Sequence, residues 1–168
     1  LEDQYTASFV VRAPRIVSWS VSSDPSAIPA TGSIRLRFTQ RMDRSSFDPG
    51  SDIACLAGPR GDIAITGFQW ISPSVLELRF DPLTAVGNNR LVLGPNILDV
   101  FGIGLDQDQD GEVGEIPDDQ YSMTFTLRGP GARGYTPSFV AGSFLSLIRV
   151  SFDRPMDPSS FQPAEDIV

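Results

Sequence analysis

Apolar and polar residues alternate along most of this chain. The alternation predicts short β-strands, because successive side chains of a strand point to opposite faces of a sheet. Leu76, Leu78 and Phe80, for example, share one face of a strand, which we expect to point inward. The expected strands cover residues 5–11, 17–21, 34–38, 53–56, 63–70, 75–80, 90–93 and 120–128. Turn-forming proline, glycine, serine and aspartate residues separate several of them.

One short stretch has a helical rather than an alternating pattern. Residues 42–47 read Met-Asp-Arg-Ser-Ser-Phe, which predicts a single helical turn capped by Asp43. Met42 and Phe47 are then expected to fill the core. With seven or eight strands and no longer helix, the chain belongs to the all-β class, and we expect an antiparallel β-sandwich.

The chain also repeats parts of its own sequence in the same order. Three segments recur at an offset of 116 for the first and 114 for the others: residues 3–12 at 119–128, residues 34–38 at 148–152, and residues 42–47 at 156–161. The expected organisation is the last strand of one repeat in residues 1–12, a complete repeat in residues 13–128, and the first strands of a following repeat in residues 129–168.

The composition is that of a globular protein, with 40% hydrophobic residues. No apolar run approaches the ~20 residues that a membrane-spanning helix needs, so membrane insertion is not expected. The sequence starts at Leu1 without a signal peptide. We therefore expect either a chain from which one has been removed or an excerpt from a longer protein.

The formal net charge of −8 is concentrated in one region. Eight of the 21 acids lie between Asp99 and Asp119, and no basic residue lies between Leu91 and Leu127. The other 13 acids are matched in number by the 13 basic residues, all of them arginine. The arginines form no basic stripe, and those at positions 35, 37 and 79 are expected on solvated strand faces. A nucleic-acid partner is therefore not expected.

Several reactive residue types are missing from the sequence. There is no histidine, which removes the usual general base and the usual zinc ligand, and no lysine for Schiff-base or isopeptide chemistry. The single cysteine, Cys55, allows no internal disulfide and is expected as a small buried hydrophobe. Carboxylates alone could serve glycoside hydrolysis, but here they cluster in a metal-like pattern. We therefore expect no enzyme.

The acidic region contains a pattern typical of calcium ligands. Asp106, Asp108 and Asp110 alternate with glutamines, and Gly111 follows. Oxygen ligands at positions 1, 3 and 5, with glycine at position 6 for a sharp turn, suit calcium, a hard ion that takes about 6–8 oxygens. At position 7, Glu112 is expected to offer its backbone carbonyl. Because clustered carboxylates repel one another, the sequence predicts bound Ca²⁺ here. The alternatives are a metal-free acidic turn and, less favoured, a site that prefers magnesium.

The pattern departs from a helix–loop–helix calcium site at its second half. Position 12 is Pro117, where such a site needs an acid that binds through both oxygens. The closing carboxylate must come from Asp118, Asp119 or Glu115. Residues 121–127 alternate like a strand, so we expect a calcium loop that leads into a β-strand and stabilises it permanently.

Taken together, these segments resemble the bacterial Ig-like domains of large surface and S-layer-type proteins. The resemblance is carried by residues 34–38, 42–47, 75–80 and 89–99, the last reading Asn-Arg-Leu-Val-Leu-Gly-Pro-Asn-Ile-Leu-Asp. That family has an Ile-x-Asp-x-x-Gly-Asn-x-Leu stretch, which Asp99 and Gly102 fit, whereas Ile103 replaces the asparagine. Some members carry an aspartate-rich loop before the last strand. The resemblance implies an Ig-like sandwich, secretion, tandem arrays, and no catalytic residues.

These features predict a calcium-stabilised stalk, spacer, fibre or adhesive module of a secreted or cell-surface bacterial protein, with neighbouring repeats as its partners. One alternative is a carbohydrate-binding or accessory module of a secreted enzyme, in which Trp19, Phe68 and Trp70 would form a sugar platform instead of packing in the core. Another is a filament subunit that self-assembles, because a leftover strand of one molecule could complete the open sheet of another.

Overall fold

The alternating segments fold into strands that form two antiparallel four-stranded sheets. The computed structural model describes residues 6–7, 12–23, 31–140 and 144–166. The strands of the two sheets are β1 (Ile16–Ser23), β2 (Thr31–Phe38), β3 (Ile53–Gly58), β4 (Gly61–Asp62), β5 (Ile65–Ser72), β6 (Val75–Leu83), β7 (Gly87–Leu93) and β8 (Tyr121–Leu127). One sheet has the order β1-β2-β6-β5 and the other β4-β3-β7-β8.

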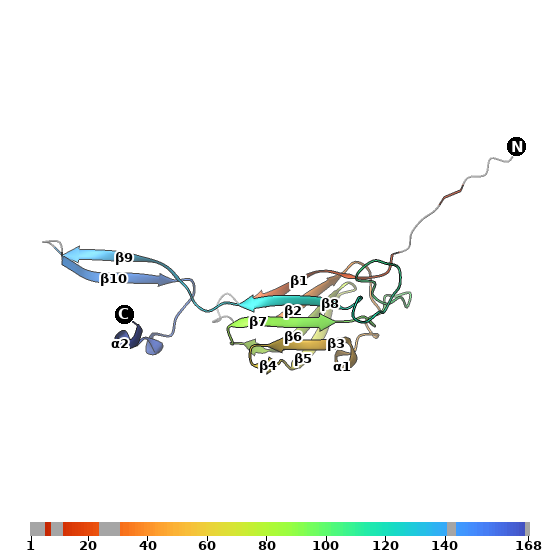
Figure 1. The fold of residues 1–168 in the computed structure, drawn as a ribbon, viewed down its shortest axis with the longest axis horizontal. Coiled ribbons are helices and arrows are strands. Elements are labelled where there is room, and N and C mark those ends of the chain that lie inside the picture. Colours follow the sequence, from red (N-terminus) through yellow and green to blue (C-terminus); the bar gives the residue numbers. More distant parts are fainter. Residues whose placement is uncertain (1–5, 8–11, 24–30, 141–143, 167–168) are drawn as a thin grey trace.

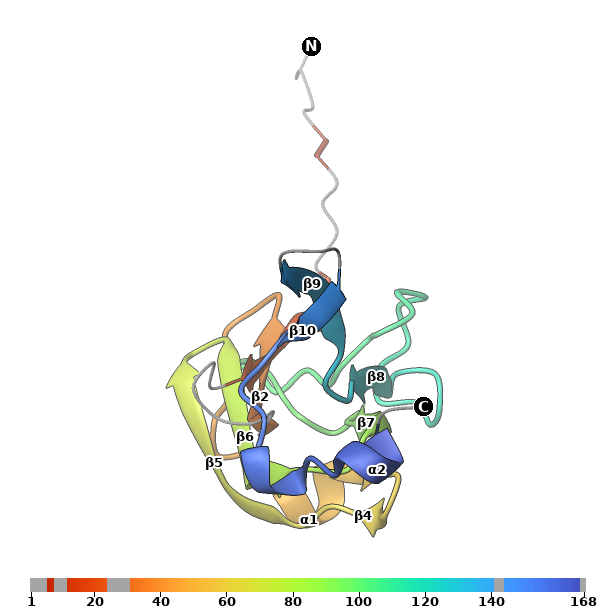
Figure 2. The same ribbon diagram turned by 90° about the vertical axis from the view of Figure 1, so that its left-hand side faces the viewer.

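The two sheets pack face to face, and the core lies between them (Figure 2). Leu76, Leu78 and Phe80 of β6 are buried, as predicted. Their neighbours in the core come from strands of both sheets and include Ile34, Leu36, Phe38, Leu91, Leu93, Met123 and Phe125. The predicted all-β class and the antiparallel sandwich are therefore confirmed.

The predicted helical turn at residues 42–47 is a hydrogen-bonded turn rather than a helix. The N–H of Ser46 donates to the carbonyl oxygen of Asp43 at 3.1 Å, and the helix α1 (Pro49–Asp52) begins only after Asp48. Met42 and Phe47 are buried in the core, as predicted. Among the described residues, no helix is long and apolar enough to cross a membrane.

Two other sequence predictions need correction, and a third concerns residues that lie mostly outside those described. The strand expected over residues 63–70 begins two residues later than predicted, since β4 ends at Asp62 and β5 runs from Ile65 to Ser72. Cys55 is half-buried rather than buried, since its side chain lies on the outer face of β3 beside Val92. Most of the strand expected over residues 5–11 lies outside the described residues.

One buried acid stabilises the centre of the first sheet. Glu77 of β6 accepts hydrogen bonds from Nε of Arg35 (2.7 Å) and Nε of Arg79 (2.8 Å), while both arginines stay about half exposed. The hydrogen bond from Arg35, and then that from Arg79, hold the pKa of Glu77 below its ordinary value of 4.5, although burial raises it.

We expect Glu77→Gln to lower the free energy of unfolding by about 1 kcal/mol at neutral pH, since solvent screens the two half-exposed arginines. Because the folded-state pKa of Glu77 is lowered, its contribution is present above the unfolded pKa and is lost as the pH falls through the folded value. Urea unfolding from neutral pH into the acid range measures this. A difference between parent and variant that stays constant down to low pH would contradict the assignment.

A second, smaller sheet follows the sandwich. Within the described part of the chain, β9 (Ala132–Val140) and β10 (Phe144–Phe152) pair only with each other, and they lie beyond the end of the sandwich at which β8 stops (Figure 1). They are followed by the 3₁₀-helix η1 (Pro158–Ser160) and the helix α2 (Pro163–Asp166). These elements have the same order as β1, β2, the turn after Met42, and α1.

Residues 128–166, which we call the second unit, reproduce local contacts from the start of the sandwich, the first unit. Asp43 Oδ1 accepts hydrogen bonds from the N–H of Ser45 (2.9 Å) and its hydroxyl (2.6 Å). Asp157 Oδ1 accepts the same pair from Ser159, at 2.9 and 2.7 Å. The strand registers also correspond, since Trp19 lies opposite Leu36 as Tyr135 lies opposite Val150. The repeated sequences therefore fold into repeated local structure.

The two units differ in how well their apolar residues are covered. Phe38 is 2% exposed, whereas its counterpart Phe152 is 45% exposed; Phe47 is 5% exposed and its counterpart Phe161 is 54% exposed. The edge of β2 pairs with β6, but the matching edge of β10 has no partner strand among the described residues. The second unit therefore presents half of a core without the half that would cover it.

Candidate metal site

The acidic loop begins where the chain leaves the core. Leu105 is fully buried, and the N–H of Asp106 donates to the carbonyl oxygen of Pro14 at 3.0 Å, so the start of the loop is fixed next to β1. Gly111 has a φ of 98°, which glycine adopts without strain. The sharp turn predicted at this glycine is confirmed.

Short backbone contacts shape the first half of the loop. The N–H of Asp110 donates to Asp108 Oδ1 at 3.2 Å, and the N–H of Glu112 donates to Asp110 Oδ1 at 2.8 Å. These are the side-chain-to-backbone turns that aspartate favours. In the described part of the chain, the second oxygen of each aspartate accepts no hydrogen bond and could bind another group.

Three carboxylates converge at the base of the loop. Asp106, Asp108 and Asp119 each place an oxygen within 4.8 Å of the other two. Asp106 and Asp119 are buried, whereas Asp108 is exposed. Asp119 is held on both sides, because its Oδ1 accepts from the N–H of Gln107 at 2.6 Å and its Oδ2 from the N–H of Glu115 at 2.9 Å. We call these three residues the carboxylate cluster.

No positively charged side chain among the described residues forms an ion pair with the carboxylate cluster. The ion pairs found in the described part of the chain involve Glu77 and Asp153, not the acidic loop. Asp106 Oδ1 is buried without a hydrogen-bond partner. A buried carboxylate oxygen without a partner is costly, since it has lost its water and gained nothing in return. The cluster therefore lacks a positive charge.

The pKa of Glu115 also reflects the negative charge of the acidic loop. Partial burial raises the pKa of Glu115, and the surrounding carboxylates of Asp110, Glu112, Asp119 and Asp118 raise it further. The negative charge of the loop therefore adds to burial in disfavouring ionisation of Glu115.

The donors of the cluster fit a hard divalent cation. All are carboxylate oxygens, which calcium prefers, and an oxygen that accepts one N–H bond still has a lone pair for a metal. A hollow of about 530 Å³ adjoins Asp106 and Asp110, so water can reach the cluster and complete a coordination shell. Asp106, Asp108 and Asp119 are thus the residues that would hold the ion.

The structure brings together three of the six residues expected as ligands. Asp106, Asp108 and Asp119 form the cluster, whereas Asp110, Glu112 and Asp118 are exposed and lie outside it. Of the three candidates for the closing position, only Asp119 belongs to the cluster. Asp119 lies in the turn that precedes β8, where the N–H groups of Gln107 and Glu115 hold its carboxylate.

Sequence reasoning missed Gln107 as a structural residue. Its side-chain amide donates to the carbonyl oxygen of Ile16 and accepts from the N–H of Ile16, both at 3.0 Å. The glutamines between the aspartates read only as spacers in the sequence, and no signal in one sequence marks Gln107 for this contact.

Asp99 fixes a turn rather than joining the carboxylate cluster. Its Oδ1 accepts from the N–H groups of Phe101 (2.8 Å) and Ile103 (2.9 Å), and Gly102 between them has a φ of 79°. The Asp-x-x-Gly part of the stretch that carries the family resemblance therefore has a local structural reason. Because the turn uses the backbone of Ile103, it does not depend on the missing asparagine.

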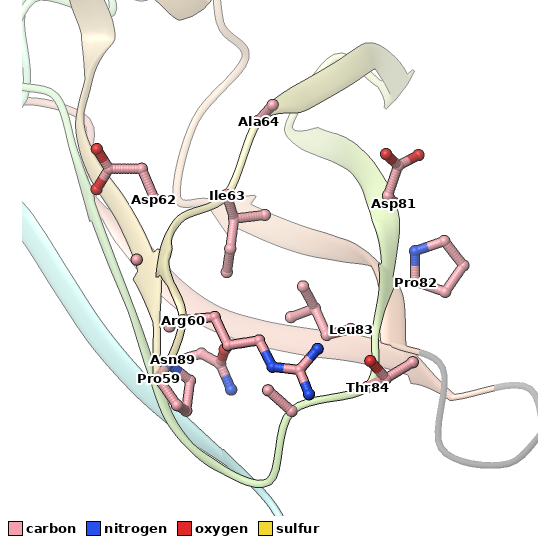
Figure 3. A pocket seen from close by; sticks show the side chains of 13 residues that line it. Pro59, Arg60, Asp62, Ile63, Ala64, Asp81, Pro82, Leu83, Thr84 and Asn89 are labelled. Atoms are coloured by element: carbon pink, nitrogen blue, oxygen red, sulfur yellow. The ribbon is translucent and has the colours of Figure 1, made fainter.

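A second hollow lies at the opposite end of the sandwich, between β4 and the end of β6 (Figure 3). Its volume is about 270 Å³. Arg60 extends across it, while Asp62 and Asp81 come from opposite sides (Figure 3). Its two carboxylates therefore do not converge as those of the carboxylate cluster do.

The three aromatic residues considered as a sugar platform do not share a surface. Trp19 lies on β1 and the other two on β5, at opposite edges of one sheet. Trp70 packs against Phe38 with ring centroids 5.5 Å apart. The expectation that all three lie in the core needs correction, since Trp19 and Phe68 are partly exposed. Carbohydrate binding stays a prediction without support from these three residues acting together.

Comparison with known proteins adds little. No protein-family model matches the chain, and no curated protein matches it. Among solved structures, the chain is similar to the structure of surface layer protein SbsC, domains 1–6, with 18% sequence identity and a TM-score of 0.46. The match covers 76% of this chain and 15% of the other. At this level of similarity, the match identifies neither a family nor a function.

Proposed function

We propose that this chain is a calcium-stabilised structural module of a repetitive secreted or cell-surface bacterial protein, in which it serves as a stalk, spacer, fibre or adhesive element. The observation that carries the proposal is the buried, unpartnered Oδ1 of Asp106 within the carboxylate cluster. A bound calcium ion would supply the missing positive charge at that oxygen. The ion would have a structural role, because it would join the start of the acidic loop to Asp119, two residues before β8.

The repeated local structure supports a tandem arrangement. The second unit has the strand register and turn contacts of the first but leaves its apolar face uncovered. The rest of a following sandwich of the same Ig-like kind would cover that face. We therefore propose residues 1–12, 13–128 and 129–168 as parts of three successive repeats, with neighbouring repeats as the main partners. A module of this kind needs no catalytic residues.

We expect ~10 mM calcium to raise the free energy of unfolding by about 1.4–2.7 kcal/mol over excess chelator, for a Kd of about 10⁻⁴–10⁻³ M. Asp108→Ala should abolish the difference, because it removes one member of the cluster while deleting no buried group. Thermal unfolding with calcium and then with chelator measures this. Asp81→Ala removes the same charge from an exposed site on β6 and should respond to calcium as the parent does.

If the parent unfolds at the same temperature in calcium and in chelator, the calcium assignment fails. If Asp108→Ala keeps the full calcium response, the ion binds elsewhere in the loop. The tandem arrangement does not depend on either result.

A second candidate function is supported by the free edge of β10. In the sandwich, the matching edge of β2 pairs with β6, so a strand of another molecule could pair with β10 and build a filament. Light scattering separates the two functions, because strand exchange gives polymers that grow with concentration. A monomer at every concentration would remove the filament alternative.

A further inference from the structure

The acidic loop contacts the residues through which the chain reaches the sandwich. We call residues 12–16 the lead-in segment, since they precede and begin β1. It lies at the end of the sandwich opposite to β9 and β10, beside the acidic loop (Figure 1). The hollow of about 530 Å³ has Arg12 and Arg15 of the lead-in segment on its lining together with Asp106 and Asp110 of the loop. The candidate metal site therefore faces this segment.

Three hydrogen bonds join the lead-in segment to Asp106 of the carboxylate cluster and to the adjacent Gln107. The N–H of Asp106 donates to the carbonyl oxygen of Pro14 at 3.0 Å. The side chain of Gln107 forms two hydrogen bonds with the backbone of Ile16, one in each direction, as a neighbouring strand would. Since the N–H of Gln107 itself donates to Asp119, Gln107 connects a cluster carboxylate directly to the first residue of β1.

Residues 128–132 of the second unit correspond to the lead-in segment, but among the described residues no acidic loop contacts them. The N–H of Arg15 donates to the hydroxyl of Thr39, as the N–H of Gly131 donates to Asp153 Oδ1 at 3.1 Å. The carbonyl oxygen of Arg12 accepts from the Gln40 side chain, as that of Arg128 accepts from Arg154 at 3.1 Å. The contacts to Asp106 and Gln107 have no counterpart there among the described residues. The loop contacts are thus an addition to a common local structure.

We propose that cation binding at the carboxylate cluster orders the lead-in segment and so sets the direction in which the preceding part of the chain leaves the sandwich. This inference rests on the proposed calcium site. Without a cation, repulsion among three carboxylates with an unpartnered buried oxygen favours opening of the loop. Opening moves Asp106 and Gln107 away from Pro14 and Ile16. The segment then keeps its contacts to Thr39 and Gln40 and the pairing of Ile16 with Phe38.

Amide hydrogen exchange of the uniformly ¹⁵N-labelled chain tests the proposal. We expect calcium to slow exchange of the Ile16 amide at least about tenfold over chelator, after normalisation to the Leu91 amide in the core. The Ala132 amide, which corresponds to Ile16 in the second unit, should not change. Exchange at Ile16 that is the same with calcium and chelator would overturn the proposal, as would equal slowing at Ala132.

A substitution at Gln107 separates this inference from the calcium site itself. Gln107→Ala keeps every carboxylate, so calcium should still raise the unfolding temperature, but the calcium-dependent protection of Ile16 should disappear. Gln120→Ala, a substitution of the same kind just before β8, should retain it. If calcium raises the unfolding temperature of the parent without protecting Ile16, the inference fails and the proposed function stands. If calcium does neither, both fail.

Discussion

Replacing Asp119 by alanine is expected to lower the free energy of unfolding by about 4 kcal/mol in ~10 mM calcium, and by about 2 kcal/mol in excess chelator. Asp119 is fully buried and accepts the N–H groups of Gln107 and Glu115, which lose their partner in the variant. The loss in chelator is limited, because removing one carboxylate also relieves repulsion from Asp106 and Asp108. The difference between the two conditions is the stabilisation that calcium provides through the cluster.

The neighbouring acid supplies the control for this experiment. Asp118 is exposed and lies outside the carboxylate cluster, so Asp118→Ala should change the free energy of unfolding by less than about 0.5 kcal/mol and should keep the calcium response. Both variants lose one negative charge at adjacent positions, which removes net charge as an explanation. Urea unfolding with calcium and with chelator measures both. Equal losses for the two variants would show that the cluster has no special role.

A pair of corresponding phenylalanines gives the second large effect. Phe38→Ala should cost about 3–5 kcal/mol, because Phe38 is buried between the sheets in contact with Trp70 and would leave a cavity. Phe152→Ala makes the same change at the corresponding place in the second unit. It should alter unfolding of the sandwich by less than about 1 kcal/mol, since Phe152 is 45% exposed and lies on β10, outside the two sheets.

Urea unfolding of the chain and both variants, followed by circular dichroism, measures this pair. The comparison tests whether the sandwich is stable without help from the second unit. A loss at Phe152 as large as that at Phe38 would mean that the second unit is covered in solution. That result would favour self-assembly over a module that awaits the rest of a following repeat.

The faces of the strands could be predicted from the sequence, but their order in the sheets could not. Alternation placed Leu76, Leu78 and Phe80 in the core, and they are buried there. The pairing of β2 with β6 joins segments about 40 residues apart, and side-chain periodicity contains no information about which strands become neighbours. The half-exposed position of Cys55 could not be predicted for the same reason, because its exposure depends on which face of β3 the other sheet covers.

Only part of the candidate metal site could be predicted, for a related reason. The spacing of Asp106 and Asp108 is local, and it identified two members of the cluster. Asp119 comes from the far end of the loop, so its place depends on how β8 pairs with β7. Gln107 could not be predicted, since its contact with Ile16 joins residues 91 positions apart.

Crystals of the chain grown with ~10 mM calcium provide the most direct test of the calcium site. The account predicts an anomalous difference peak at the carboxylate cluster, with oxygens of Asp106, Asp108 and Asp119 about 2.3–2.6 Å from the ion. Well-ordered carboxylates that surround only water, or that point away from one another into solvent, would contradict it.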